Sequence, residues 1–144
     1  MPTRIATAAD LDDLVSLFAA YLDFYGVGKP ERQVRAFLAE RLERDDSTLL
    51  IARDDGANAQ GFVQLYPLYD SLALRPSFLL SDLYVAEHAR RQGIGERLLE
   101  AAGGGSGKIK GMGGEPQTHP MGETFFSQVP FRFDGRDVVL LRRD

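Results

Sequence analysis

The sequence contains no cysteine and no tryptophan, and it has only two histidines. Without cysteine there is no disulfide, no thiolate metal site and no cysteine nucleophile. His88 and His119 lie in unrelated segments, which argues against a histidine-rich metal centre. No apolar run reaches the roughly 18 residues that a membrane helix needs, and the N-terminus lacks the order of a signal peptide. We therefore expect a soluble, cytoplasmic protein with no metal and no membrane partner.

Basic residues are in the minority. The 144 residues include 17 Lys and Arg against 21 Asp and Glu, a formal net charge of -4. This balance argues against nucleic acid as a partner, because phosphate backbones bind to concentrated positive charge. The hydrophobic share of 44% is that of a globular chain and excludes disorder throughout. The length predicts a single domain over residues 1–144.

Helical and strand-like periods alternate along the chain. Apolar residues at three- and four-residue steps predict a helix over residues 11–25, introduced by a capping pair of Thr7 with Asp10, and a second helix after Pro30. Short apolar runs predict strands over 3–6, 48–53, 61–69, 78–85 and 138–141, and a further helix over 93–102. Pro67 is expected to end its strand or mark a bulge, and a longer connection through Pro76 is expected to follow. The fold class is therefore α/β or α+β.

The most informative stretch is SDLYVAEHARRQGIGERLLE, residues 81–100, in which a buried strand leads through an R-x-x-G-x-G turn into a helix. The first turn of a helix offers free backbone N–H groups and the positive end of its dipole. Gly93 and Gly95 remove side chains that would keep an anion away, and Arg90 and Arg91 add positive charge. The pattern predicts an anion site, although a tight turn with a basic surface patch would look similar.

These residues resemble the central motif of the GCN5-related N-acetyltransferase (GNAT) family, in which R/Q-x-x-G-x-G/A binds the pyrophosphate of acetyl-CoA. The resemblance extends from about residue 3 to residue 102 and includes the preceding segment GFVQLYPLYDSLALRPSFLLSDLYV. It implies a GNAT-like mixed central sheet flanked by helices, with acetyl-CoA as cosubstrate. The resemblance assigns coenzyme binding to Leu83, Tyr84, Val85, Arg90, Arg91, Gln92, Gly93, Ile94, Gly95 and Glu96.

An acceptor site is also implied. Asp82 falls where some polyamine-type members keep an acidic residue that faces the acceptor amine, and a carboxylate there could orient an ammonium group or pass its proton to water. The alternative is a strand-end aspartate bonded to nearby backbone. Tyr21, Tyr25 and Tyr66 are candidates to line the acceptor pocket, although aromatic residues at helical spacing are also typical of a plain core.

The chain departs from the family after residue 102. Residues 103–114, GGGSGKIKGMGG, form a glycine-rich irregular segment where the family continues a helix. Residues 115–120 resemble a damaged fifth strand, and Phe126 falls where many members carry a catalytic tyrosine at the end of a helix. The C-terminal part is therefore expected to be incomplete or irregular.

The prediction is an N-acetyltransferase that moves an acetyl group from acetyl-CoA to a primary amine of a small molecule: an amine, polyamine or amino acid. A small-molecule amine acceptor is the expected partner, and a homodimer is compatible with this interpretation. Two alternatives stay open. One is a coenzyme A-binding protein that has lost catalysis, and the other is the product of a disrupted reading frame.

Overall fold

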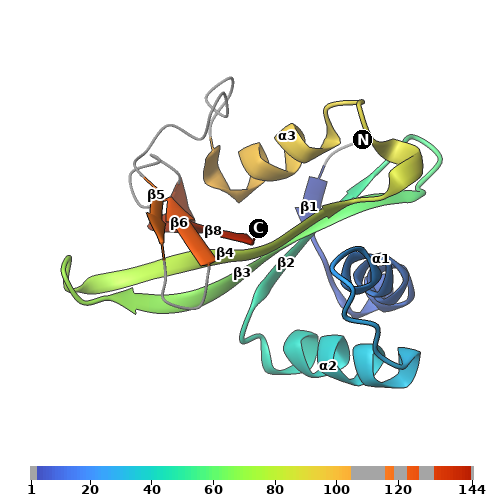
Figure 1. Ribbon diagram of the computed structural model, residues 1–144, viewed down its shortest axis with the longest axis horizontal. Coiled ribbons are helices and arrows are strands. Elements are labelled where there is room, and N and C mark those ends of the chain that lie inside the picture. The colour runs from blue at the N-terminus through green and yellow to red at the C-terminus, as the bar shows by residue number, and fades with distance from the viewer. Residues whose placement is uncertain (1–2, 105–115, 119–122, 127–131, 144) are drawn as a thin grey trace.

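A mixed sheet with helices on both faces forms the body of the molecule (Figure 1). The computed structural model describes residues 3–104, 116–118, 123–126 and 132–143. In these residues the sheet has eight strands in the order β1-β2-β3-β4-β8-β6-β5, with β7 paired to β8. The strands are β1 (Thr3–Ile5), β2 (Thr48–Arg53), β3 (Ala59–Asp70), β4 (Arg75–Val85), β5 (Pro116–Thr118), β6 (Glu123–Phe126), β7 (Arg132–Phe133) and β8 (Arg136–Arg143). The helices are α1 (Leu11–Phe24), α2 (Glu31–Arg44) and α3 (Ile94–Leu99). The predicted mixed central sheet flanked by helices is confirmed.

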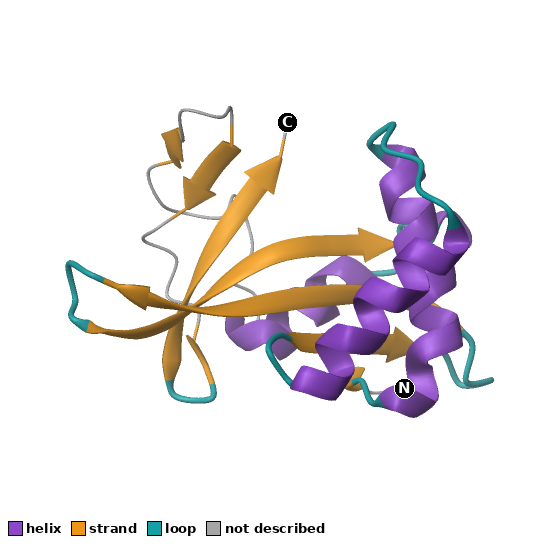
Figure 2. Ribbon diagram, turned by 90° about the horizontal axis from the view of Figure 1, so that it is seen from below, coloured by secondary structure: helices purple, strands orange, loops and turns teal. Residues whose placement is uncertain are grey.

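Helices α1 and α2 cover one face of the sheet (Figures 1 and 2). The apolar residues of α1 recur every three or four positions, so they share one side of the helix, and that side is buried. It packs on Ile51 of β2 and Phe62 of β3, which are both fully buried. The helix ends before Gly26, whose φ of +71° suits glycine. The buried residues of this layer are Ala6, Leu14, Val15, Leu17, Phe18, Tyr21, Val34, Leu38, Leu49, Ile51 and Phe62.

Helix α3 covers the opposite face (Figure 1). Ile94 and Leu98 lie one turn apart on its buried side and pack against Val63 and Leu80 of the sheet. Gly61 on β3 allows this close approach, because a Cβ atom there would lie 2.6 Å from the Tyr84 carbonyl oxygen and 3.1 Å from Leu98 Cδ1. The helix is thereby held directly over the ends of β3 and β4.

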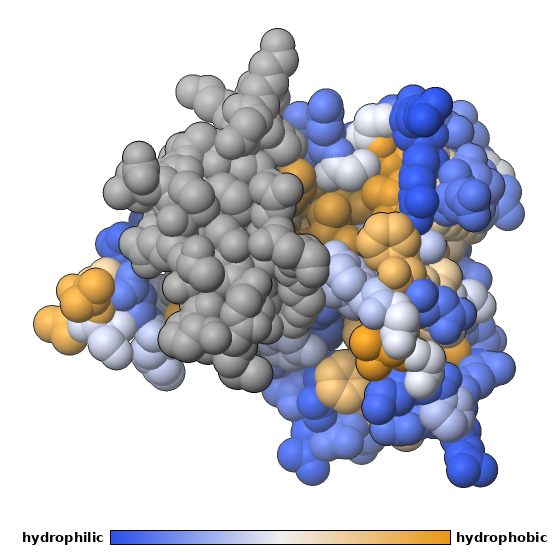
Figure 3. Space-filling model, in the orientation of Figure 1, coloured by the Kyte–Doolittle hydropathy of each residue, from blue (hydrophilic) through white to orange (hydrophobic). Residues whose placement is uncertain are grey.

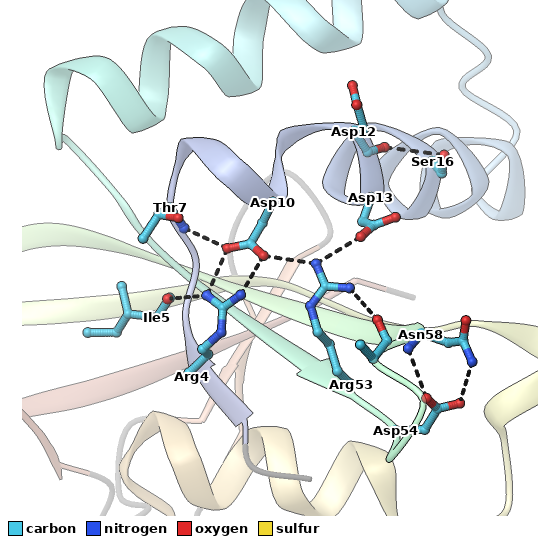
Figure 4. A network of polar contacts seen from close by, with 11 residues as sticks. Arg4, Ile5, Thr7, Asp10, Asp12, Asp13, Ser16, Arg53, Asp54 and Asn58 are labelled. Atoms are coloured by element: carbon cyan, nitrogen blue, oxygen red, sulfur yellow. Dashed lines mark hydrogen bonds and ion pairs between the residues drawn. The ribbon is translucent and has the colours of Figure 1, made fainter.

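A buried carboxylate anchors the start of the chain (Figure 4). Asp10 is 2% exposed, and it accepts two hydrogen bonds from the Arg4 guanidinium, at 2.8 and 2.6 Å, and one from Arg53 at 2.8 Å. The Thr7 backbone N–H donates to it at 2.8 Å, which confirms the predicted capping contact. The hydrogen bond from Arg4, helped by those from Thr7 and Arg53, holds the pKa of Asp10 well below its usual range. The network ties β1 and β2 to the beginning of α1.

Two expectations about β3 and β4 are wrong. Strand β3 runs through Pro67 without ending or bulging, and the bulge in this pair of strands lies in β4, opposite Gln64 and Leu65. Proline is tolerated because β2 pairs with β3 only as far as Leu65, so the missing N–H at Pro67 costs no bond to β2. Pro76 is part of β4 and pairs with Tyr69, so the expected longer connection is a short turn over residues 71–74.

The C-terminal part differs from the expected arrangement. The strand beside β4 is β8, which runs parallel to it, whereas the residues expected as a fifth strand form β5 at the sheet edge. Phe126 lies in strand β6, opposite Leu140, so its expected place at the end of a helix is wrong, and its part in the reaction stays a prediction. The glycine-rich segment lies, from residue 105 on, outside the described residues, and so does His119.

Candidate active site

Strands β4 and β8 separate part-way along their length and leave one edge of β4 open. They pair only between residues 77–80 of β4 and residues 137–140 of β8. Figure 2 shows the two strands diverging beyond that point, with β8 leading to the C-terminus. Within the described part of the chain, Leu83, Tyr84 and Val85 have a paired strand on the β3 side only. An extended ligand with amide groups could add to this edge as a further strand would.

A bulge in β4 determines which way its last residues face. Gln64 pairs with Asp82, and the next residue of β3, Leu65, pairs with Leu80, so Ser81 is the extra residue. One extra residue reverses the alternation of side chains. Phe78 and Leu80 pack on the α3 side of the sheet. Tyr84 lies four residues after Leu80 and would face the same side in a regular strand, but it packs on the α1 side. The bulge therefore turns Asp82 toward α1.

Asp82 sits in a buried chain of hydrogen bonds. Its carboxyl group is 8% exposed; Oδ1 accepts from the Tyr21 hydroxyl at 2.7 Å, and Oδ2 accepts from Gln64 Nε2 at 3.1 Å. Ser47 Oγ in turn donates to Gln64 Oε1 at 3.0 Å. These bonds come from side chains of α1 and β3 rather than from nearby backbone. These two donors fix the orientation of the carboxyl group.

The turn between β4 and α3 presents backbone amides at a helix start. Gly93 has φ +77° and Arg91 has φ +65°, a sharp left-handed turn that glycine makes easily. The first backbone hydrogen bond of the helix runs from the Arg97 N–H to the Gly93 carbonyl oxygen, at 3.1 Å. The N–H groups of Ile94, Gly95 and Glu96 therefore have no carbonyl partner within the helix and point outward from its N-terminus. A Cβ at Gly95 would meet only Val85 Cγ2, at 3.7 Å, so packing alone does not require glycine there.

The two arginines of the motif have different surroundings. Arg90 Nε donates to the Val85 carbonyl oxygen at 3.0 Å, and its guanidinium lies 5.6 Å and 5.5 Å from the ring centroids of Phe24 and Tyr84. Arg90 therefore ties the turn to the end of β4 and to α1, by a hydrogen bond and two cation–π contacts. The Arg91 side chain is exposed beside the amides.

Two hollows meet at the Tyr21–Asp82 pair. The first, of about 400 Å³, lies between α1, α2 and the middle of the sheet, and Tyr66 and Asp82 line it. The second, of about 370 Å³, lies between the end of α1 and residues 83–85, and Tyr21, Tyr25 and Arg90 line it. The three tyrosines expected in one acceptor pocket are thus divided between two hollows. Figure 3 shows apolar patches over α1 and α2 amid hydrophilic surface on this face.

Sequence reasoning missed Gln64 and Ser47. The signal for Gln64 was present, because it is one polar residue in the apolar run GFVQLY and is fully buried. Such a residue needs a polar partner, since an unbonded buried amide is costly. Ser47 carries no comparable signal, because it precedes β2 and becomes relevant only through the pairing of β2 with β3.

Comparison with known proteins agrees with this geometry. The model of the acetyltransferase (GNAT) family matches residues 14–102. The chain belongs to this family. It is 40% identical over 102 residues to an uncharacterized N-acetyltransferase, YhfO, of Bacillus subtilis (strain 168). That alignment covers 71% of this chain and 68% of the relative. It is 36% identical over 93 residues to a probable acetyltransferase of Haemophilus influenzae, with coverage of 65% and 64%.

A solved structure supports the same family fold. The crystal structure of a probable acetyltransferase superposes with a TM-score of 0.66 at 42% identity, over 69% of this chain and 67% of that one. The GNAT match makes this chain an acyltransferase, and the family generally uses acetyl-CoA. In the described part of the chain, no helix is long and apolar enough to cross a membrane.

Proposed function

We propose that this GNAT protein transfers the acetyl group of acetyl-CoA to the primary amine of a small molecule. The observation that carries the proposal is the position of Asp82, a buried carboxyl one residue before the open stretch of β4. It lines the 400 Å³ hollow, whose size lies in the lower part of the range for small-molecule sites, about 300–1,000 Å³.

Several features of the turn and of the open strand edge suit the donor. The open edge at residues 83–85 suits the amide groups of the pantetheine arm, and the amides of Ile94, Gly95 and Glu96 suit the pyrophosphate. Gly95 supports this role, because the fold would accept a side chain there. Arg91 adds an exposed positive charge nearby.

Acetyl-CoA supplies a thioester whose carbonyl carbon the neutral amine nitrogen attacks. Asp82 would hold the incoming ammonium group, accept one of its protons and pass it to water. The C–N bond forms and the C–S bond breaks; the nitrogen gives up its second proton to solvent, and the thiolate that leaves takes a proton from solvent. Holding donor and acceptor side by side at the Tyr21–Asp82 pair supplies the main rate gain, because it removes the entropy cost of bringing them together.

The experiment combines binding and turnover. Acetyl-CoA is titrated calorimetrically, and release of the coenzyme A thiol is followed with a panel of small amines. Asp82→Asn keeps the shape of the side chain, and we expect it to lower kcat/KM for the amine about 100-fold while the coenzyme Kd stays unchanged. Asp70→Asn is the control, because Asp70 is the last residue of β3, where its carboxyl accepts from the Leu72 amide of the hairpin turn and lines neither hollow.

Three results would contradict the proposal. Absence of acetyl-CoA binding would remove the donor. Binding without any thiol release would remove the transfer to amines. A change confined to the coenzyme Kd in Asp82→Asn would show that this carboxyl does not serve the acceptor.

A further inference from the structure

The hollow assigned to the acceptor has an apolar body and carries opposite charges from two elements. Its apolar and aromatic lining consists of Phe18, Leu22, Val34, Phe37 and Tyr66. Among the described residues that line it, Asp82 of β4 is the single carboxyl and Lys29, just before α2, is the single cation. Gln33 and Ser81 complete the lining. A ligand that fits this hollow must therefore suit both a negative and a positive partner.

Lys29 is available to a ligand. It is exposed and makes no ion pair with any residue in the described part of the chain. The acidic residue next to it in sequence, Glu31, pairs instead with Arg35 at 3.5 Å, and Arg35 also binds Asp12 at 2.6 Å. The four-carbon stem of a lysine can lie along apolar walls while its ammonium group reaches a ligand at the mouth.

We infer that the acceptor is a monoamine with an apolar body and a carboxylate at the end away from the amine. This inference rests on the proposed function and narrows it. With the amine at Asp82, the carboxylate reaches toward Lys29 and the body fills the space between Phe18, Phe37 and the other apolar walls. A diamine or polyamine would instead turn a second ammonium group toward Lys29, and that repulsion selects against it. Polyamines, included in the first expectation, are thereby excluded as preferred acceptors.

Three acceptors of equal length test the charge directly: 6-aminohexanoate, hexylamine and hexane-1,6-diamine, whose far ends are negative, neutral and positive. We expect kcat/KM to fall about five-fold at each step in that order, as one solvent-exposed ion pair allows. High salt should compress the differences, because the lysine is exposed and therefore screened. 4-(2-Aminoethyl)benzoate and phenethylamine form a second matched pair, in which an aromatic body carries either a carboxylate at its far end or none.

Variants assign the effect to Lys29. Lys29→Glu should reverse the order and make the diamine the best acceptor, and Lys29→Met should level the three. Arg32→Glu is the matched control: it makes the same charge change three residues away, outside the hollow lining, and should keep the parent order. The acetyl-CoA affinity of each variant, measured by calorimetry, should equal that of the parent.

The outcomes separate this inference from the function on which it rests. A parent enzyme that acetylates the diamine best, or a Lys29→Glu variant that keeps the parent order, overturns the inference while amine acetylation stands. A protein that binds acetyl-CoA but acetylates none of the five amines contradicts the proposed function, and the inference falls with it.

Discussion

Tyr21 donates its hydroxyl hydrogen to Asp82 across 2.7 Å and thereby joins the first helix to the open end of the fourth strand. The Tyr21 ring is held in place by neighbours on both sides: Phe62 at 5.6 Å between centroids and Tyr84 at 6.0 Å. Tyr21 lines the hollow beside residues 83–85, and Asp82 lines the hollow between α1, α2 and the middle of the sheet, so this bond joins the linings of the two.

Tyr21→Phe removes the bond and keeps the ring packing. We expect the amine KM to rise several-fold, because Asp82 loses a donor that orients it, while the coenzyme Kd is unchanged. The free energy of unfolding in urea should fall by about 1.5–3 kcal/mol, as for a hydrogen bond to a charged group. A variant with weakened coenzyme binding and a normal amine KM would disprove the orienting role.

The turn before α3 is tested by a pair of substitutions at Gly93. Asparagine and aspartate both tolerate a positive φ, so Gly93→Asn and Gly93→Asp keep the turn at similar cost and differ in charge. The Asp variant should bind acetyl-CoA at least tenfold more weakly than the Asn variant, because its carboxylate faces the pyrophosphate. The difference should shrink in high salt. Equal affinities would place the phosphates elsewhere.

Asp10 makes stability depend on pH. The pKa of Asp10 in the folded protein lies below the ordinary value of 3.8. Its ion pairs therefore stabilise the fold fully above pH 3.8, and this stabilisation is lost as the pH falls from there through the folded pKa. Asp10→Asn should cost about 3 kcal/mol at neutral pH, as for breaking a buried pair. The gap between parent and variant should narrow below about pH 4.

Asp12→Asn is the control for that measurement. Asp12 lies two residues later, in the first turn of α1, and pairs with Arg35 at 2.6 Å, but its side chain is 88% exposed. Exposed pairs contribute about 1 kcal/mol or less. A loss in Asp12→Asn as large as that in Asp10→Asn would contradict the importance given to burial.

Gly61→Ala tests the contact between β3, β4 and α3. The added methyl would lie 2.6 Å from the Tyr84 carbonyl oxygen, so backbone must move. We expect a loss of about 1–3 kcal/mol in unfolding free energy, typical of overpacking. Gly28→Ala, whose Cβ would meet a single atom at an ordinary 3.6 Å, should change stability little. Equal stability of the two variants would show that both β4 and α3 can shift away from the added methyl group freely.

Local patterns predicted the first hundred residues well. The strand at Thr48–Arg53 and the helix that ends before Gly26 follow from apolar periodicity, which depends only on near neighbours in sequence. The bulge at Ser81 was not predictable in this way. It depends on the register against β3 and decides which face Asp82 occupies, so the hydrogen-bond partners of Asp82 could not be read from the strand itself.

The tail shows the same limit more strongly. Residues 138–141 were recognised as a strand from composition, and β8 covers them. Their place beside β4 was not expected, because strand order depends on contacts between residues about 60 positions apart. The prediction that Pro67 ends or bulges its strand was wrong for a related reason, because a proline is tolerated there only where β2 no longer pairs with β3.

The parallel pairing of β4 with β8 also sets the order of events during synthesis on a ribosome. Residues 3–85 contain β1 to β4 and the two helices that cover them. This part of the sheet can form as it emerges, because all of its strand pairs are antiparallel and lie within these residues. Until residues 137–140 have been translated, β4 has no partner strand on the side that β8 later occupies. At about 5–20 residues per second, the nascent chain would spend several seconds with the whole length of β4 unpaired on that side. During that interval this edge of β4 is open to pairing with any other extended chain, which makes it the place where misassembly would begin.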